Sequence, residues 1–96
     1  MSAYVLFQAE VLDPDAYEAY KTKAEATVLA AGGRYIVRGG DVVTLEGDAP
    51  VGRTVVLEFP TMQVALDWYR SDEYAVARRL REGVARARVF VVDGVQ

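Results

Sequence analysis

The residues of this chain that could do chemistry are few, and one glutamate stands out among them. Glu58 lies in the otherwise apolar run Val55-Val56-Leu57-Glu58-Phe59, directly before Pro60. A carboxyl group held in a dry cavity has a raised pKa and can act as a general acid or base. A glutamate at the end of a strand can equally be solvated or paired with an arginine, and ion pairs shift pKa values without any catalysis. Glu58 is the candidate catalytic residue, with a structural ion pair as the alternative.

Arg38 is the expected partner of Glu58. In an antiparallel hairpin that closes through residues 47–52, the segment after Arg38 lies opposite the end of the strand that carries Glu58. Gln8 and Glu10 end the first strand, which we expect to run beside and parallel to that strand, so that all four polar groups meet at one edge. Arg38 could bind a carboxylate or an enolate there in bidentate fashion, with Gln8 nearby. A plain Arg38–Glu58 salt bridge is the alternative.

An aromatic cluster is expected on the second half of the chain. Trp68, Tyr69 and Tyr74 form an aromatic cluster on the expected second helix, and Arg81 flanks the stripe that follows. Such residues could line an apolar, substrate-binding pocket with a few polar tips. The simpler interpretation is ordinary core between helix and sheet.

The composition removes whole classes of chemistry. The 96 residues include no cysteine and no histidine, the usual ligands of transition metals and haem. We therefore expect no metal and no cofactor. A balance of 14 acidic against 11 basic residues disfavours nucleic acid as a partner. Without a signal-like N-terminus or a membrane-length apolar run, the expected location is the cytoplasm, with no membrane association.

Alternation and turn residues predict a single domain over residues 1–96 with the order β-α-β-β-α-β, the ferredoxin-like α+β arrangement. Strands are expected at residues 2–11, 34–46 (bent or bulged at Gly39-Gly40), 53–59 and 87–92. The first helix begins at the Asp13-Pro14 cap, carries Tyr17, Tyr20, Ala24, Val28 and Ala31 at helical spacing, and ends at Gly32-Gly33. The second begins at Thr61 and carries Met62, Leu66 and Tyr69 on one stripe. A fresh cap at Ser71-Asp72-Glu73 starts a further helical piece that ends near Gly83.

Both faces of the expected strands are apolar. In the first strand Val5 and Phe7 alternate with Tyr4 and Leu6, and in the last strand Val89 and Val91 alternate with Phe90 and Val92. Helices can cover only one face of such a sheet. The other face is then an expected interface, and the symmetric solution is a twofold homodimer that packs sheet against sheet.

Several segments, in order along nearly the whole chain, resemble the bacterial family known as domain of unknown function 1330. They are Arg38-Gly39-Gly40, Leu45-Glu46-Gly47, Glu58-Phe59-Pro60, Trp68-Tyr69-Arg70-Ser71, Glu73-Tyr74, Arg81 and Val92-Asp93-Gly94. The resemblance implies a dimeric α+β barrel, in which ferredoxin-like protomers pair through their sheets. That superfamily includes cofactor-free monooxygenases, haem enzymes, lactone isomerases and ligand-sensing domains. The haem branches generally supply an axial histidine, which this chain lacks.

Two functions follow from these observations. The first is an enzyme without metal or cofactor that binds or transforms a small anionic or carbonyl-containing molecule, with Arg38 orienting an oxygen, Glu58 moving a proton, and Tyr69 or Trp68 forming the wall. The second is a non-catalytic dimeric module that senses a ligand or has a structural role. Fold does not choose between them.

Overall fold

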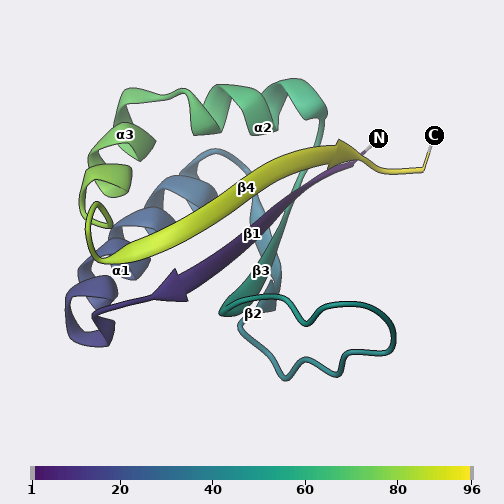
Figure 1. Ribbon diagram of the computed structural model, residues 1–96. Coiled ribbons are helices and arrows are strands. Elements are labelled where there is room, and N and C mark those ends of the chain that lie inside the picture. The colour runs from purple at the N-terminus through teal and green to yellow at the C-terminus, as the bar shows by residue number, and fades with distance from the viewer. Residues whose placement is uncertain (1, 96) are drawn as a thin grey trace.

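A computed structural model describes residues 2–95 (Figure 1). The elements are β1 (Ala3–Val11), α1 (Pro14–Ala30), β2 (Arg34–Arg38), β3 (Arg53–Phe59), α2 (Met62–Tyr69), α3 (Asp72–Arg79) and β4 (Ala85–Asp93). This is the predicted β-α-β-β-α-β order, with the second helix in two pieces. Within the described residues, every helix is too short or too polar to cross a lipid bilayer.

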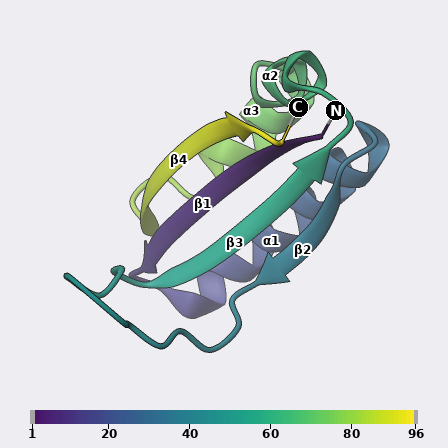
Figure 2. The ribbon, with the colours of Figure 1, turned by 90° about the vertical axis from the view of Figure 1, so that its right-hand side faces the viewer.

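The four strands form one antiparallel sheet in the order β2-β3-β1-β4. All three helices lie on the same side of it, and the other face is left open (Figures 1 and 2). The two ends of the described chain meet at the neighbouring ends of β1 and β4, where Gly94 N–H donates to the Ser2 carbonyl at 2.8 Å. The fold is therefore a two-layer α+β arrangement with one uncovered sheet face.

Local signals in the sequence set the helix ends. Asp13 caps α1 by accepting from the Ala16 N–H, and Pro14 occupies the first turn. Gly32, in a left-handed conformation with φ of 86°, ends that helix. Thr61 and Ser71 cap α2 and α3 in the same way as Asp13 caps α1. These caps are the predicted ones.

The core lies between the helices and the inner face of the sheet. Every second residue of β1 and β3 is buried, and α1 contributes the predicted stripe of Tyr17, Tyr20, Ala24 and Val28. On α2 the buried residues are Ala65 and Trp68 rather than the expected Met62 and Leu66. The buried stripe of α2 is therefore displaced by one residue from the predicted stripe.

The strand directions and the bulge differ from the sequence-based expectation. β1 runs antiparallel to β3, not parallel to it, with Ala3 opposite Phe59 and Ala9 opposite Arg53. The ladder between β2 and β3 is irregular between Tyr35 and Val37, so the bulge lies at Ile36 instead of Gly39-Gly40. An extra residue reverses which side chains point to which face beyond it. Arg38 thereby turns to the helix side.

Residues 40–52, which we call the arm, connect β2 to β3 without regular structure, so the predicted strand continuation over residues 41–46 is wrong. The arm stands out from the end of the sheet, on the side away from the helices (Figures 1 and 2). Two glycines hold its base. Gly39 (φ 71°) donates its N–H to the Thr54 carbonyl at 2.9 Å, and Gly52 (φ 78°) passes so close to the Ala9 carbonyl that a Cβ would overlap it.

Replacing Gly52 with alanine should be far more harmful than replacing Gly47. Both glycines have positive φ, but a Cβ at Gly47 meets nothing within 4 Å. Gly47→Ala should cost only the backbone strain, about 1 kcal/mol. Gly52→Ala adds a clash with backbone and should cost about 3 kcal/mol or more. Urea unfolding of both variants measures this, and equal losses would contradict the close approach at the arm's base.

Candidate functional site

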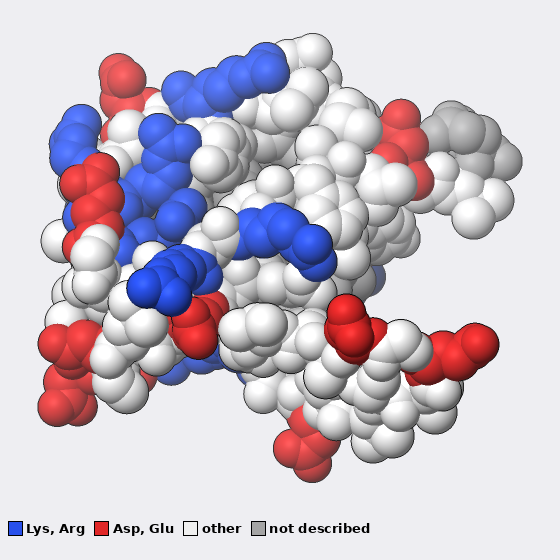
Figure 3. All heavy atoms as spheres, viewed as in Figure 1, with Lys and Arg blue, Asp and Glu red and all other residues white. Residues whose placement is uncertain are grey.

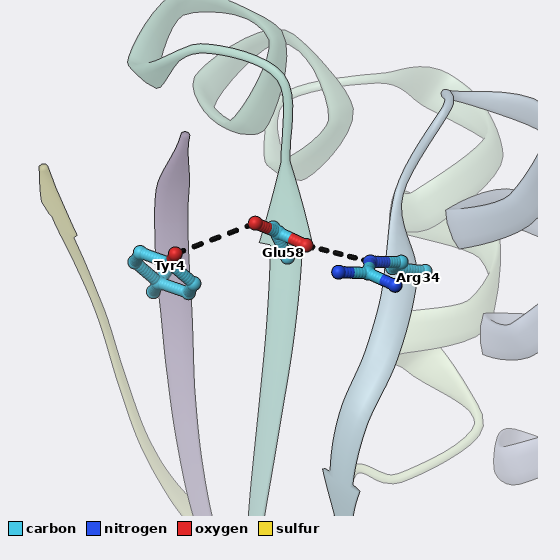
Figure 4. Close-up of polar contacts among 3 residues, drawn as sticks. All are labelled: Tyr4, Arg34 and Glu58. Carbon is cyan, nitrogen blue, oxygen red and sulfur yellow. Dashed lines mark hydrogen bonds and ion pairs between the residues drawn. The ribbon is translucent and has the colours of Figure 1, made fainter. Parts of the chain in front are cut away.

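Glu58 lies on the open face of the sheet, between β1 and β2 (Figure 4). Its carboxylate accepts from Arg34 Nε at 2.6 Å and from the Tyr4 hydroxyl at 3.3 Å. The Ser2 hydroxyl and then the Arg34 guanidinium hold the pKa of Glu58 below its ordinary value. This is the ion-paired alternative of the sequence analysis, with Arg34 in place of Arg38. A carboxylate with a lowered pKa is a poor proton acceptor near neutral pH.

Arg38 does not meet Glu58. Its Nη1 donates to Glu25 of α1 at 2.5 Å, and its guanidinium lies 4.3 Å from the centre of the Tyr35 ring. The bulge at Ile36 puts Arg38 on the helix side while Glu58 is on the open side, and the register puts Arg38 opposite Val55, well before Glu58. The predicted Arg38–Glu58 pair is therefore wrong, since Arg34 is the residue of β2 that lies opposite Glu58.

Gln8 also lies apart from Glu58. Because β1 is antiparallel to β3, Gln8 is opposite Thr54 at the start of β3 and opposite Arg88 of β4. Its Oε1 accepts from Arg88 Nη2 at 2.5 Å. Glu10 pairs with Arg86 at 3.4 Å at the same end. The expected meeting of four polar groups does not occur: two sit at one end of the open face, Glu58 at the other, and Arg38 on the opposite face.

The aromatic residues do come together, in the core between helices and sheet. Trp68 lies 4.3 Å from the ring of Tyr74 and 5.1 Å from that of Phe59, and Tyr69 lies 5.4 Å from Tyr74. The hydroxyl groups of Tyr20 and Tyr74 are hydrogen-bonded at 2.7 Å. Burial raises the pKa of Tyr20 far above its ordinary value, so its hydroxyl stays protonated. These side chains build core, and their hydroxyls give it a polar centre.

Arg81 is the cation beside this polar centre. Its guanidinium lies 5.3 Å from the Phe7 ring and 5.5 Å from the Tyr20 ring, and its buried Nε has no hydrogen-bond partner. Burial lowers the pKa of Arg81, but the hydroxyls of Tyr74 and Tyr20 outweigh this and raise it. The Nε of Arg53 is likewise buried and unpaired. Within residues 2–95 no carboxylate forms an ion pair with either arginine.

Tyr17 connects the two arginines. Burial raises the pKa of its hydroxyl, while the charges of Arg53 and Arg81 act against that rise. Both guanidinium groups are thus close enough to act on one hydroxyl. Two partly buried cations at a phenol, without a counter-ion, form a place where an anion is favoured.

A cavity of about 30 Å³ lies beside Tyr17 and Arg53, between α1 and the sheet, and Arg81 is not among the residues that line it. It is lined by Phe7, Tyr17, Tyr20, Ala24, Val28, Tyr35, Val55, Leu57 and Trp68, and by the cations Lys21, Arg38 and Arg53. This is about the volume of one water molecule. An organic ligand needs side chains to move outward, and Lys21 and Arg38 are partly exposed at this place. No carboxylate lines the cavity.

A wider groove of about 890 Å³ runs between α1 and the α2–α3 pair. Its floor is apolar and includes Thr27 and Trp68, whose indole N–H donates to the Thr27 hydroxyl at 3.1 Å. Asp67, Asp72 and Glu73 lie along it, with Lys23 as its cation. The acidic side chains make this groove unsuited to an anion, so the smaller cavity is the better candidate for an anionic ligand.

Two arginines of the structure, Arg53 and Arg34, were not predicted as site residues from the sequence. Arg53 begins a strand and belongs to no motif, and its role depends on the packing of Gly39 and Tyr17 around it. Arg34 lies opposite Glu58 in the ladder between β2 and β3, a register that the sequence pattern does not fix. No group of three or more acidic side chains able to hold a metal ion is found in the described part of the chain.

The layers, strand order and one-sided helices define the chain as a ferredoxin-like α+β protein. The model of the family Domain of unknown function (DUF1330) matches residues 2–95. The chain therefore belongs to the DUF1330 family. No curated protein sequence matches it.

Solved structures with low sequence identity share the fold. The RPA0582 protein of unknown function from Rhodopseudomonas palustris is 19% identical with a TM-score of 0.73, covering 99% of this chain and 83% of that one. SnoaB, a cofactor-independent oxygenase from Streptomyces nogalater, is 9% identical with a TM-score of 0.64, covering 99% and 94%. A dimeric protein of unknown function and ferredoxin-like fold from Bacteroides fragilis is 7% identical with a TM-score of 0.58, covering 97% and 96%.

Glu58→Gln should lower the melting temperature at pH 7 by a few degrees, because Arg34 and Ser2 then lose a charged partner. Since the pKa of Glu58 is lowered in the folded state, its contribution is present above the unfolded-state pKa and is lost as the pH falls. The difference from wild type should shrink below about pH 4. Thermal melts between pH 7 and 3 measure it.

Glu82→Gln is the matched control, because Glu82 is exposed in the turn after α3 and forms no ion pair with the described residues. It should leave the melting temperature unchanged over the same range. A higher melting temperature for Glu58→Gln at pH 7 would contradict the ion-pair assignment and restore Glu58 as a destabilised, functional carboxylate.

Proposed function

We propose that this protein is a homodimer, paired through its open sheet faces, that binds a small anionic aromatic molecule between α1 and the sheet. The observation that carries the proposal is the pair Arg53 and Arg81, two partly buried guanidinium groups with unpaired Nε atoms and no carboxylate partner among the described residues. In this proposal the anionic group of the ligand lies between Arg53 and Arg81, beside the Tyr17 hydroxyl.

The free-energy cost of burying two guanidinium groups without a paired charge supports a ligand role for Arg53 and Arg81. Removing a guanidinium from water without a paired charge is unfavourable, so proteins keep such groups where a counter-ion arrives or where hydroxyls and rings compensate. Tyr20 and Tyr74 compensate Arg81 in part. The unpaired Nε atoms are donors that a carboxylate or phenolate oxygen would satisfy, and the apolar lining suits an aromatic ring.

The surroundings favour binding over proton transfer. Tyr20 stays protonated, no carboxylate lines the cavity, and Glu58 is on the other face with a lowered pKa. The likeness to the oxygenase SnoaB supports only a common fold at 9% identity. Of the two functions derived from the sequence, a non-catalytic ligand-binding dimer has the better support. A catalytic role for Glu58 would need the second protomer to change its surroundings.

The open sheet face supports the dimer. Its centre is apolar, and Phe90 and Val92 of β4 are nearly half exposed, as is Val37 of β2. Leu6 and Val56 fill the space between them. A contiguous apolar sheet face of this kind is typical of an interface, and the Bacteroides fragilis relative is a dimeric protein of the same fold.

Phe90→Asp should raise the dissociation constant of the dimer at least about a hundredfold, because it buries an unpaired charge in the interface. Val76→Asp is the matched control, since Val76 has similar exposure but lies on α3, away from the open face. Sedimentation equilibrium measures both. A wild-type protein that is folded and monomeric at micromolar concentration would overturn the dimer.

Ligand binding can be followed by the fluorescence of Trp68, the one tryptophan of the chain, whose ring lines the cavity. Benzoate should quench or shift the emission in a saturable way, and neutral benzamide should bind much more weakly. Arg81→Met should weaken benzoate at least about tenfold, the loss expected for a charge-assisted hydrogen bond. Arg79→Met, an exposed arginine of α3, is the control. Equal response to benzoate and benzamide, or no effect of Arg81→Met, would contradict the anion site.

A further inference from the structure

The arm is an extended segment whose large apolar side chains are half or more exposed. Leu45 is 91% exposed, Val43 is 79% exposed, and Val42 and Val51 are at least half exposed. No hydrogen bond or ion pair joins residues 40–51 to the rest of the described chain. Loops of this length without structure of their own are uncommon in small domains unless they have a function.

The base of the arm is fixed although its body is free. Gly39 and Gly52 adopt left-handed conformations and lie tightly against Arg53 and the Ala9 carbonyl. The sheet thus presents the arm in one direction, past the open face and away from the helices (Figures 1 and 3). A fixed base with an exposed apolar body is the arrangement of a docking element.

The charge of the arm is one-sided. It carries Asp41, Glu46 and Asp48 and no lysine or arginine, and Figure 3 shows acidic atoms on the projecting segment with the basic ones elsewhere. On the open face the first half of β4 carries Arg86, which is highly exposed and only loosely paired, and Arg88, whose partner Gln8 is neutral. An acidic arm and a basic strand end in one chain are complementary between two copies of that chain.

A hollow of about 620 Å³ lies where these features meet. It is lined by the arm residues 48–51, by Gln8 and Glu10 of β1, and by residues 86–88 of β4. It is continuous with the open face, because Gln8 and Arg88 are on that face. The hollow therefore offers both the basic side chains and the apolar wall of Pro50 and Val51 to an incoming segment.

We propose that the arm clasps a second copy of the chain, its apolar side chains packing on the partner's open face and its carboxylates facing the partner's Arg86 and Arg88. This inference rests on the proposed dimer and adds to it a specific element. A lipid surface is the less suitable occupant, since three carboxylates repel anionic headgroups.

The double variant Val43→Ser/Leu45→Ser tests the apolar part. Both residues are exposed in the single chain, so folding should be unaffected, and a thermal melt under dissociating dilution checks this. The dissociation constant of the dimer should rise at least tenfold by sedimentation equilibrium. Leu29→Ser is the matched control, an exposed leucine on α1 outside the interface, and it should change nothing. If the double variant has the dissociation constant of the wild type, the arm does not contribute to the dimer.

A charge exchange tests the polar part. Asp41→Lys/Glu46→Lys and Arg86→Glu/Arg88→Glu should each weaken self-association, and an equimolar mixture should form heterodimers more tightly than either variant forms homodimers. If the heterodimer dissociates as readily as the two variant homodimers, the pairing of the arm with β4 is overturned. If wild type is a monomer, the dimer itself fails; if wild type is a dimer and the arm variants match it, only the clasp fails.

Discussion

The packing of Trp68 against both Phe59 and Tyr74 is the interaction on which the rest of this small fold depends. It joins α2, α3 and β3 in one aromatic layer, and the Tyr20–Tyr74 hydroxyl bond extends that layer to α1. A domain of this size buries little apolar surface, so large rings that contact several elements at once contribute much of the buried area. The same rings bring hydroxyls inside the protein, and Arg81 is held beside them.

The sequence was sufficient for the element order, the caps and the buried stripe of α1, because each depends on neighbours close in the chain. The sequence was also sufficient for the aromatic cluster, since Trp68, Tyr69 and Tyr74 lie close together in the chain, although the stripe predicted for α2 did not include Trp68. The pair Arg38–Glu58 failed because the register places Arg34 opposite Glu58, and because the bulge at Ile36 exchanges the faces of β2 without a glycine or proline to mark it. The meeting with Gln8 and Glu10 failed because β1 runs antiparallel to β3, which is a property of the whole topology.

The two faces of the sheet carry different kinds of polar group. On the open face the polar side chains are paired: Arg34 donates to Glu58, and Arg88 donates to Gln8. On the helix face Arg53 and Arg81 are left with unsatisfied donors. Polar groups that are paired hold a surface in place, whereas polar groups that are unpaired and enclosed favour a molecule from outside. This asymmetry places the proposed dimer surface and the proposed binding site on opposite faces of a single four-stranded sheet.

The two glycines at the base of the arm have a consequence for how such a chain can diversify. Gly52 against Ala9 and Gly39 against Arg53 fix the positions where the arm leaves and rejoins the sheet, whatever lies between them. Lengthening a loop between fixed ends costs little free energy. Residues 40–51 can therefore change in length and chemistry while the pairing of β2 with β3 is preserved. Under the clasp proposed above, a change in residues 40–51 would alter the surface offered to the partner and leave the sheet unchanged.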